Sequence, residues 1–179
     1  MSKGTVIKRL PKLVEARKLA TARAHFNGFM EAADLPRLAQ AAQTIDAVEA
    51  TLSFFINDEN KRMLEGKVVA KVELECQRCL GGLLIELEAP VSLTMAWDDE
   101  QARALPKTSD PWIVGEGEED LHFALEEELL LAMPVVSYHE HDCIDKSLLS
   151  SNDEIDAEPA LKANPFSVLE QLKVKKPDA

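Results

Sequence analysis

Two cysteines, Cys76 and Cys79, stand two residues apart in the stretch 75–82, which reads ECQRCLGG. This spacing lets two thiolates bind one tetrahedral zinc ion, and the glycines that follow would let backbone amides turn toward the sulfurs. The same spacing occurs in redox pairs, and either cysteine would also serve as an ordinary residue of a turn. Three hypotheses are therefore open: a metal knuckle, a redox pair and a plain turn.

One cysteine pair does not complete a zinc site. The missing ligands are available in the cluster of His139, His141 and Cys143. The candidate zinc site is therefore Cys76, Cys79, His139 and Cys143, and zinc is the one cofactor that the sequence suggests. The alternative is a plain buried cysteine, because Cys76 alternates in register with the apolar residues of the preceding segment.

Catalytic chemistry has less support from the sequence. A reactive Cys-x-x-Cys pair is usually activated at a helix N-terminus, whereas this pair lies between two strand-like segments. The sequence contains no Gly-x-Ser-x-Gly, phosphate loop or His-Glu-x-x-His motif. His25 and His122 are predicted to be surface or packing residues, and the acidic run 126–128 is predicted to be the solvated side of a helix. We therefore expect a protein that is not an enzyme, with a thiol oxidoreductase or a zinc-stabilised adaptor as the alternatives.

The elements that position the cysteines are long strands. Apolar and polar residues alternate along 45–57, 61–76 and 83–97, which is typical of half-buried antiparallel strands. A sheet of this kind buries one face against another layer, and the helical spacing of Leu121, Leu125 and Leu129 provides a covering helix from about 120 to 132. The predicted fold class is therefore α+β: an antiparallel meander packed by one or two helices, with a flexible acidic C-terminal tail.

Smaller elements complete the prediction. Pro11 is expected to begin a helix that runs to about Ala20, and Pro36 a second helix within 35–42. The segment 23–31 favours a strand. The segment 98–117 is expected to be a surface loop that includes a short strand at 112–114.

The charge distribution is uneven. A net charge of −12 opposes general attraction to phosphate backbones. The first 23 residues nevertheless gather seven cations around a single acid. From this cluster we predict an RNA-binding surface made by Lys8, Arg9, Lys12, Arg17 and Lys18. The alternative is an ordinary solvated face of a helix.

Composition also divides the chain. We expect a single domain over 1–143, a flexible acidic linker over 144–163 and a short helical docking segment over 164–179. In the last segment Phe166, Leu169 and Leu172 share one helical face and are predicted to bind a protein partner. The alternative is that this segment folds back on its own domain.

The expected location of the protein is the cytoplasm. No apolar run approaches the roughly 20 residues that span a bilayer, and the N-terminus leads into charged sequence rather than a signal peptide. An odd number of cysteines, three, also suits free thiols or metal ligands better than a disulfide framework.

Four motifs in order support a resemblance to a known family. They are LECQRCL at 74–80, EELLLAMP at 127–134, the cluster from His139 to Cys143, and NPFSVL at 164–169. Together they resemble the YceD family of large ribosomal RNA subunit accumulation proteins over nearly the whole chain. Some members carry a further Cys-x-x-Cys-like pair near Cys143, whereas this chain has His139, His141 and a single cysteine there.

The resemblance implies a ribosome biogenesis factor that supports the synthesis, processing or stability of large-subunit rRNA. It implies no catalytic residues. The partners that it implies are a large-subunit rRNA precursor or ribosome-assembly proteins, with no membrane and no small-molecule substrate.

Overall fold

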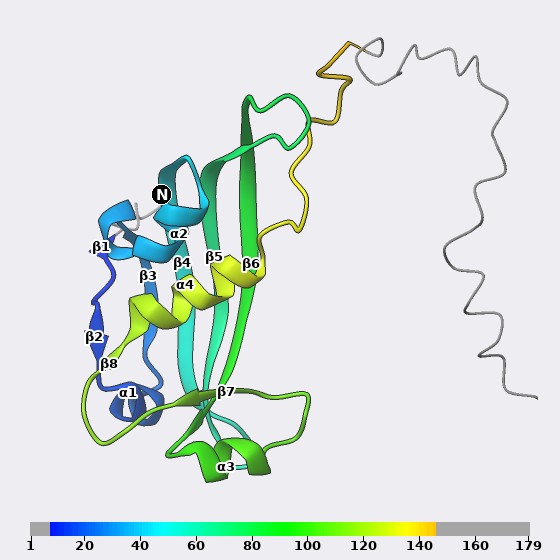
Figure 1. Ribbon diagram of the computed structural model, residues 1–179. Coiled ribbons are helices and arrows are strands. Elements are labelled where there is room, and N and C mark those ends of the chain that lie inside the picture. The colour runs from blue at the N-terminus through cyan, green and yellow to red at the C-terminus, as the bar shows by residue number, and fades with distance from the viewer. Residues whose placement is uncertain (1–7, 146–179) are drawn as a thin grey trace, which may run out of the picture. The chain divides into compact units, whose positions relative to one another are not determined.

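The computed structural model describes residues 8–145, and its centre is a set of three long antiparallel strands. These are β4 (Thr44–Ile56), β5 (Arg62–Glu75) and β6 (Gly82–Ala96), which lie side by side in Figure 1. Their register places Val48 opposite Ala70, and Ala70 opposite Leu87. The predicted meander and the α+β class are confirmed.

The whole sheet has six strands and is mixed rather than antiparallel. Its order is β1-β3-β4-β5-β6-β7. At one edge β1 (Lys8–Arg9) pairs in parallel with β3 (His25–Met30), and at the other β7 (Asp110–Ile113) pairs in parallel with β6. The predicted antiparallel pairing holds from β3 to β6. The two edge strands pair in parallel because helix-containing crossovers rather than tight turns lead to them.

Within residues 8–145, helices cover one face of the meander (Figure 1). The buried positions of β4 are Val48, Ala50, Leu52 and Phe54, which alternate with more exposed residues. Helix α4 (Leu121–Leu131) crosses the sheet in Figure 1, and its Leu121, Leu125 and Leu129 are each 0% exposed. Asp120 caps this helix by accepting a hydrogen bond from the backbone N–H of Phe123. The predicted covering helix is confirmed.

The start of the chain differs from the prediction. The first helix, α1, spans Ala16–Ala22, and the residues before it form β2 (Leu13–Val14), which pairs with β8 (Glu119–Asp120). The predicted helix from Pro11 to Ala20 is therefore wrong in its first turn. The reason is a tertiary pairing, because the backbone N–H of Leu121 donates to the carbonyl of Lys12 at 2.8 Å and holds this segment extended.

The other short elements are largely as expected. Strand β3 and helix α2 (Pro36–Ala41) confirm the predictions, and a short 3-10 helix, η1 (Ala32–Asp34), precedes α2. Strand β7 confirms the strand expected near 112–114. The segment 98–117 is more ordered than a loop, since it also contains α3 (Asp99–Ala104), capped by the side chain of Asp98.

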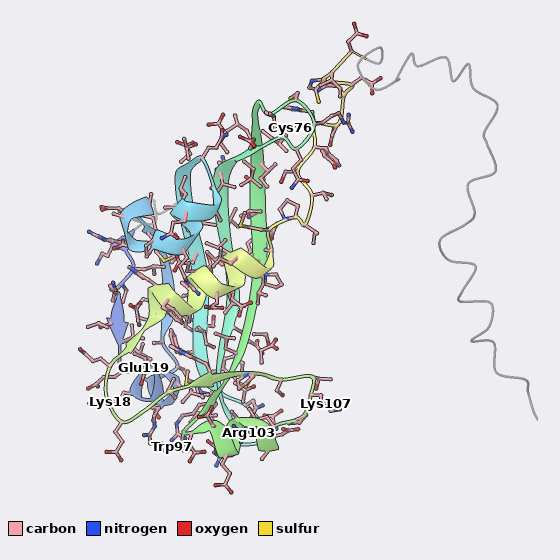
Figure 2. All side chains as sticks on the ribbon, in the orientation of Figure 1. Lys18, Cys76, Trp97, Arg103, Lys107 and Glu119 are labelled. Atoms are coloured by element: carbon pink, nitrogen blue, oxygen red, sulfur yellow. The ribbon has the colours of Figure 1, made fainter. Side chains whose placement is uncertain are left out.

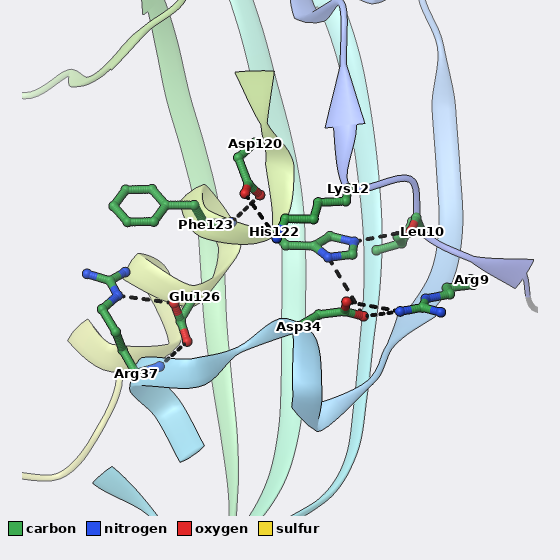
Figure 3. A network of polar contacts seen from close by, with 9 residues as sticks. All are labelled: Arg9, Leu10, Lys12, Asp34, Arg37, Asp120, His122, Phe123 and Glu126. Atoms are coloured by element: carbon green, nitrogen blue, oxygen red, sulfur yellow. Dashed lines mark hydrogen bonds and ion pairs between the residues drawn. The ribbon is translucent and has the colours of Figure 1, made fainter. Parts of the chain in front are cut away.

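Glu126 corrects the prediction of a solvated acidic run. Its side chain is 2% exposed and accepts a hydrogen bond from the backbone N–H of Arg37 at 2.8 Å (Figure 3). It also accepts one from the backbone N–H of Leu38 at 3.0 Å. The residue that precedes α2, Leu35, offers no side-chain acceptor. The first N–H groups of a helix lack partners within it, so the carboxylate of Glu126 caps α2 from a distant helix.

His122 and His25 are a packing residue and a surface residue, as the sequence predicted. His122 is 1% exposed, and its Nε2–H donates to the carbonyl of Leu10 at 3.1 Å (Figure 3). His25 is exposed on β3 and hydrogen-bonds Ser53 at 2.9 Å. Neither residue lies in the cysteine cluster.

The compact unit treated below ends at Cys143. Nearly all of the predicted linker over 144–163, and the predicted docking segment with Phe166, Leu169 and Leu172, lie outside the described residues. Among the helices of residues 8–145, none is long and apolar enough to cross a membrane.

Candidate functional site

The turn between β5 and β6 holds the first two thiols. The N–H of Cys76 donates to the carbonyl of Gly81 at 2.9 Å, and the N–H of Leu80 returns to the carbonyl of Cys76 at 2.8 Å. Leu80 has a left-handed backbone with φ 60°. This tight turn keeps Cys76 and Cys79 on the same side of the hairpin.

A second segment brings the other two candidate ligands to this turn. After α4 the chain passes the hairpin, where the N–H of Gln77 donates to the carbonyl of Ser137 at 2.8 Å. His139 is fixed by its Nε2–H, which donates to the carbonyl of Gly82 at 3.1 Å. As a result the ligand atoms of Cys76, Cys79, His139 and Cys143 all lie within 4.8 Å of one another.

The spacing of these atoms fits a tetrahedral zinc ion. The Sγ atoms of Cys76 and Cys143 are 3.8 Å apart, and Cys79 Sγ lies 3.5 Å from Nδ1 of His139. Zinc–sulfur and zinc–nitrogen bonds of usual length, at tetrahedral angles, predict about 3.8 Å between two sulfurs and about 3.6 Å between sulfur and nitrogen. His141 packs against the ring of His139 and is not part of the group.

The histidine is oriented as a ligand. Because its Nε2–H is engaged by the carbonyl of Gly82, the lone pair of neutral His139 is on Nδ1, which faces Cys79. In metal-binding histidines, the ring nitrogen that does not bind the metal usually donates a hydrogen bond, which fixes the tautomer and the ring orientation.

The thiols differ in their electrostatics. Burial of Cys76 favours its neutral form, but the backbone N–H groups of Cys79, Arg78 and His139 outweigh burial and lower the pKa of Cys76 to about 5. The pKa of Cys143 is raised by burial and by the neighbouring thiols of Cys79 and Cys76. Three thiolates at this distance repel one another, so full ionisation of the cluster requires a cation.

The five predicted RNA-binding residues are not gathered on one helix. Lys8 and Arg9 lie on β1, Lys12 precedes β2, and Arg17 and Lys18 lie on α1. Three of them are paired with acids. Arg9 contacts Asp34 at 2.9 Å, Lys12 contacts Asp120 at 3.6 Å and Lys18 contacts Glu15.

The Arg9 pair is the best defined of these. Burial of Asp34 favours its neutral form, but hydrogen bonds from Arg9 and from the backbone N–H of Glu31 outweigh burial and lower the pKa of Asp34. A cation held in this way has less of its charge available to another anion.

Arg17 has a different environment, which includes Arg62, a residue that the sequence did not single out. Arg17 and Arg62 both line an open pocket of about 600 Å³, together with Lys18, Glu15 and Glu116. The guanidinium of Arg17 lies over the ring of Trp97. Among residues 8–145, the Nε atoms of Arg17 and Arg62 are buried and have no hydrogen-bond partner.

The register of the β5–β6 hairpin predicts that Arg62 and Trp97 lie at the same end of the sheet. Met63 pairs with Thr94, so the beginning of β5, with Arg62, and the end of β6, before Trp97, must meet at one end of the sheet. Figure 2 shows that end with Lys18, Trp97 and Arg103, while Cys76 lies at the opposite end. The two candidate sites therefore lie at opposite ends of the long strands.

The fold and these sites define an α+β protein that carries a Cys3His cluster at a hairpin turn. Its residues 64–173 match the family described as Large ribosomal RNA subunit accumulation protein YceD. The chain belongs to this family, which confirms the resemblance drawn from its motifs.

A curated relative supports the same assignment along almost the full length. The chain is 34% identical over 173 residues to the Large ribosomal RNA subunit accumulation protein YceD of Haemophilus influenzae, covering 93% of this chain and 98% of the relative. No solved structure matches the chain. The family description names an accumulation factor and no reaction.

Proposed function

We propose that this protein is a non-enzymatic ribosome biogenesis factor that supports the accumulation of large-subunit rRNA by binding in the cytoplasm. The observation that carries the proposal is the match to the relative of that name, at 34% identity over 173 residues. Its partners would be the large-subunit rRNA precursor or ribosome-assembly proteins.

The proposed RNA contact is the end of the sheet that carries Arg17 and Arg62. Guanidinium groups bind phosphate through parallel N–H donors, and both arginines line the open pocket at this end of the sheet. Lys8, Arg9, Lys12 and Lys18 would add long-range attraction. The acid partners of Arg9, Lys12 and Lys18 reduce that contribution.

The proposed cofactor is one structural zinc ion held by Cys76, Cys79, His139 and Cys143. Four protein ligands would leave no open position for a substrate, as in structural rather than catalytic zinc sites. The ion would join the β5–β6 turn to the segment after α4, and so stabilise the end of the sheet opposite the arginines.

The rival proposal is a thiol oxidoreductase that uses Cys76 and Cys79. The lowered pKa of Cys76 favours it. Its burial opposes it, because Cys76 is 0% exposed and a redox thiol must be reached by its partner. Alkylation separates the two: an oxidoreductase would react rapidly at Cys76 with iodoacetamide, whereas zinc-bound thiolates would react only after a chelator is added.

The predicted docking of Phe166, Leu169 and Leu172 on a protein partner is retained as a proposal from the sequence. Its test compares the full chain with a chain that ends at Ala163. Loss of co-purifying ribosomal precursors from the shorter chain would support it, and equal recovery would contradict it.

The experiment that tests the function is complementation in the organism from which the gene comes. Removing the gene should lower the ratio of large-subunit to small-subunit rRNA, and the wild-type gene should restore the ratio. The double variant Arg17→Glu/Arg62→Glu should fail to restore it. The matched control is Lys71→Glu on the open face of the sheet, which should complement fully. An unchanged ratio after removal of the gene would overturn the proposed function.

A further inference from the structure

A groove between α4 and strand β7 belongs to neither site described above. Its volume is about 590 Å³, and its floor and walls are apolar: Leu93, Pro111, Trp112, Ile113, Phe123, Ala124 and Leu131. Phe123 and Leu131 are 53% and 78% exposed and lie eight residues apart on α4. Apolar side chains gathered in an open groove mark an interaction surface.

The lining of the groove also contains acidic residues. It carries Asp110, Glu119, Asp120, Glu127 and Glu128 and no lysine or arginine. Some of these acids are engaged, since Asp120 caps α4 and contacts Lys12, and Glu127 pairs with Arg37. Asp110 and Glu128 have no salt bridge to a described lysine, arginine or histidine.

The carboxylates of Asp110 and Glu128 lie close enough to interact. Burial raises the pKa of Glu128, and the negative charges of Asp110 and Glu127 raise it further. Within residues 8–145 the groove therefore gathers negative charge beside apolar surface. A cation brought by a ligand would relieve this repulsion.

The geometry favours a helix over an added strand as the occupant. Strand β7 is an edge strand of only four residues, and its Pro111 lacks the N–H that a further strand would need. The stripe from Phe123 to Leu131 spans about 12 Å, or roughly two helical turns. A helix with apolar side chains on one face would match this stripe.

We propose that this groove binds a basic amphipathic helix of a protein partner, with apolar residues against Phe123, Ile113 and Leu131 and lysine or arginine against Asp110 and Glu128. The inference is independent of the proposed RNA contact, because the groove shares no residue with the Arg17–Arg62 pocket.

The test uses the full chain and a fluorescent 18-residue peptide that forms an amphipathic helix of leucine and lysine. A control peptide has glutamate in place of every lysine. Anisotropy should show saturable binding of the lysine peptide, and at least tenfold weaker binding of the glutamate peptide.

Three variants locate the binding. Leu131→Ser should weaken binding of the lysine peptide at least tenfold. The matched control, Leu84→Ser, removes another leucine that is 78% exposed, from the distant hairpin, and should bind as the wild type does. Asp110→Lys/Glu128→Lys should reverse the preference, so that the glutamate peptide binds more tightly. Melting curves of all three should match that of the wild type, because the replaced side chains lie on the surface of the groove or hairpin.

Several outcomes would overturn the inference. Equal binding of the two peptides, or unchanged binding by Leu131→Ser, would show that the groove does not recognise this chemistry. A dimer that Leu131→Ser dissociates would assign the groove to a second copy of the chain. Tighter peptide binding by a chain that ends at Ala163 would assign it to the C-terminal residues of the same chain. RNA affinity should be unchanged in the Leu131→Ser variant, so failure here is distinguishable from failure of the proposed function.

Discussion

The two ends of the long strands carry opposite kinds of polar site. At the hairpin end, three thiols and a histidine converge within 4.8 Å and need a cation to balance their ionised forms. At the other end, Arg17 and Arg62 line one pocket, and the Nε atom of each has no hydrogen-bond partner among residues 8–145. Charge must therefore be assessed site by site, because a net charge of −12 describes neither end.

The largest expected effect comes from removing a thiol at the hairpin end. Cys76→Ser should abolish stoichiometric zinc binding and lower the melting temperature by about 10 °C. Loss of a structural metal costs several kcal/mol of stability, and each kcal/mol lost lowers the melting temperature by about 2–4 °C. Elemental analysis and thermal melting measure both.

The matched control for this change is Cys143→His, which keeps four ligands and should keep the zinc. RNA affinity should be equal in both variants at a temperature where both are folded. A Cys76→Ser protein with full zinc content would refute the assigned ligand set.

The second effect concerns the helix that lies between the two ends. Glu126→Gln should lower the free energy of unfolding by about 2 kcal/mol, because the amide is a weaker acceptor for the N–H groups of α2 and leaves Arg37 without its buried partner. Urea unfolding gives this value.

Glu127→Gln is the control on the same helix, and its half-exposed pair with Arg37 should contribute no more than about 0.5 kcal/mol. Neither variant should alter zinc content or RNA affinity below its unfolding transition. A change in either property would mean that the two ends are coupled through α4.

The third effect tests whether Arg17 and Arg62 at the basic end contact RNA phosphates. Arg17→Gln/Arg62→Gln should weaken binding of a large-subunit rRNA fragment about tenfold at 0.1 M salt, and should reduce the slope of log affinity against log salt by about 2. Filter binding at several salt concentrations measures both values. Zinc content is the control and should not change. An unaltered slope would exclude these two residues as phosphate contacts.

The smallest effect separates paired from unpaired cations. Arg9→Gln should change RNA affinity by less than about twofold, because Asp34 already holds the guanidinium of Arg9 at 2.9 Å. The same filter-binding measurement applies. A loss as large as that of the Arg17→Gln/Arg62→Gln variant would show that the whole N-terminal cluster acts as one surface.

The central strands and α4 could be predicted because their signals are local. Alternation along β4, β5 and β6 and the spacing of Leu121, Leu125 and Leu129 follow from one buried face per element. Cys76 and Cys79 could be predicted as a pair for the same reason. Cys143 and His139 lie at least 60 residues after Cys79 in sequence, so no local pattern shows that they meet the turn.

The errors came from interactions between residues distant in sequence. Leu13 joins a strand because it meets Asp120, and Glu126 is buried because the N-terminus of α2 lies beside it. Local patterns contain neither fact. The pairing of Arg9 and Lys12 with acids was hidden in the same way, whereas Lys18 pairs with Glu15 only three residues before it. The number of cations in the sequence therefore overstated the charge available for RNA.

The positions of the four ligands along the chain have a consequence for the order of folding. Cys76 and Cys143 are 67 residues apart, and the segment between them contains β6, α3, β7, β8 and α4. A newly made chain would offer zinc only two of the four side chains until residues 139–143 have been made and have reached the turn. Bound zinc would then act as a cross-link that closes a loop containing all of these elements.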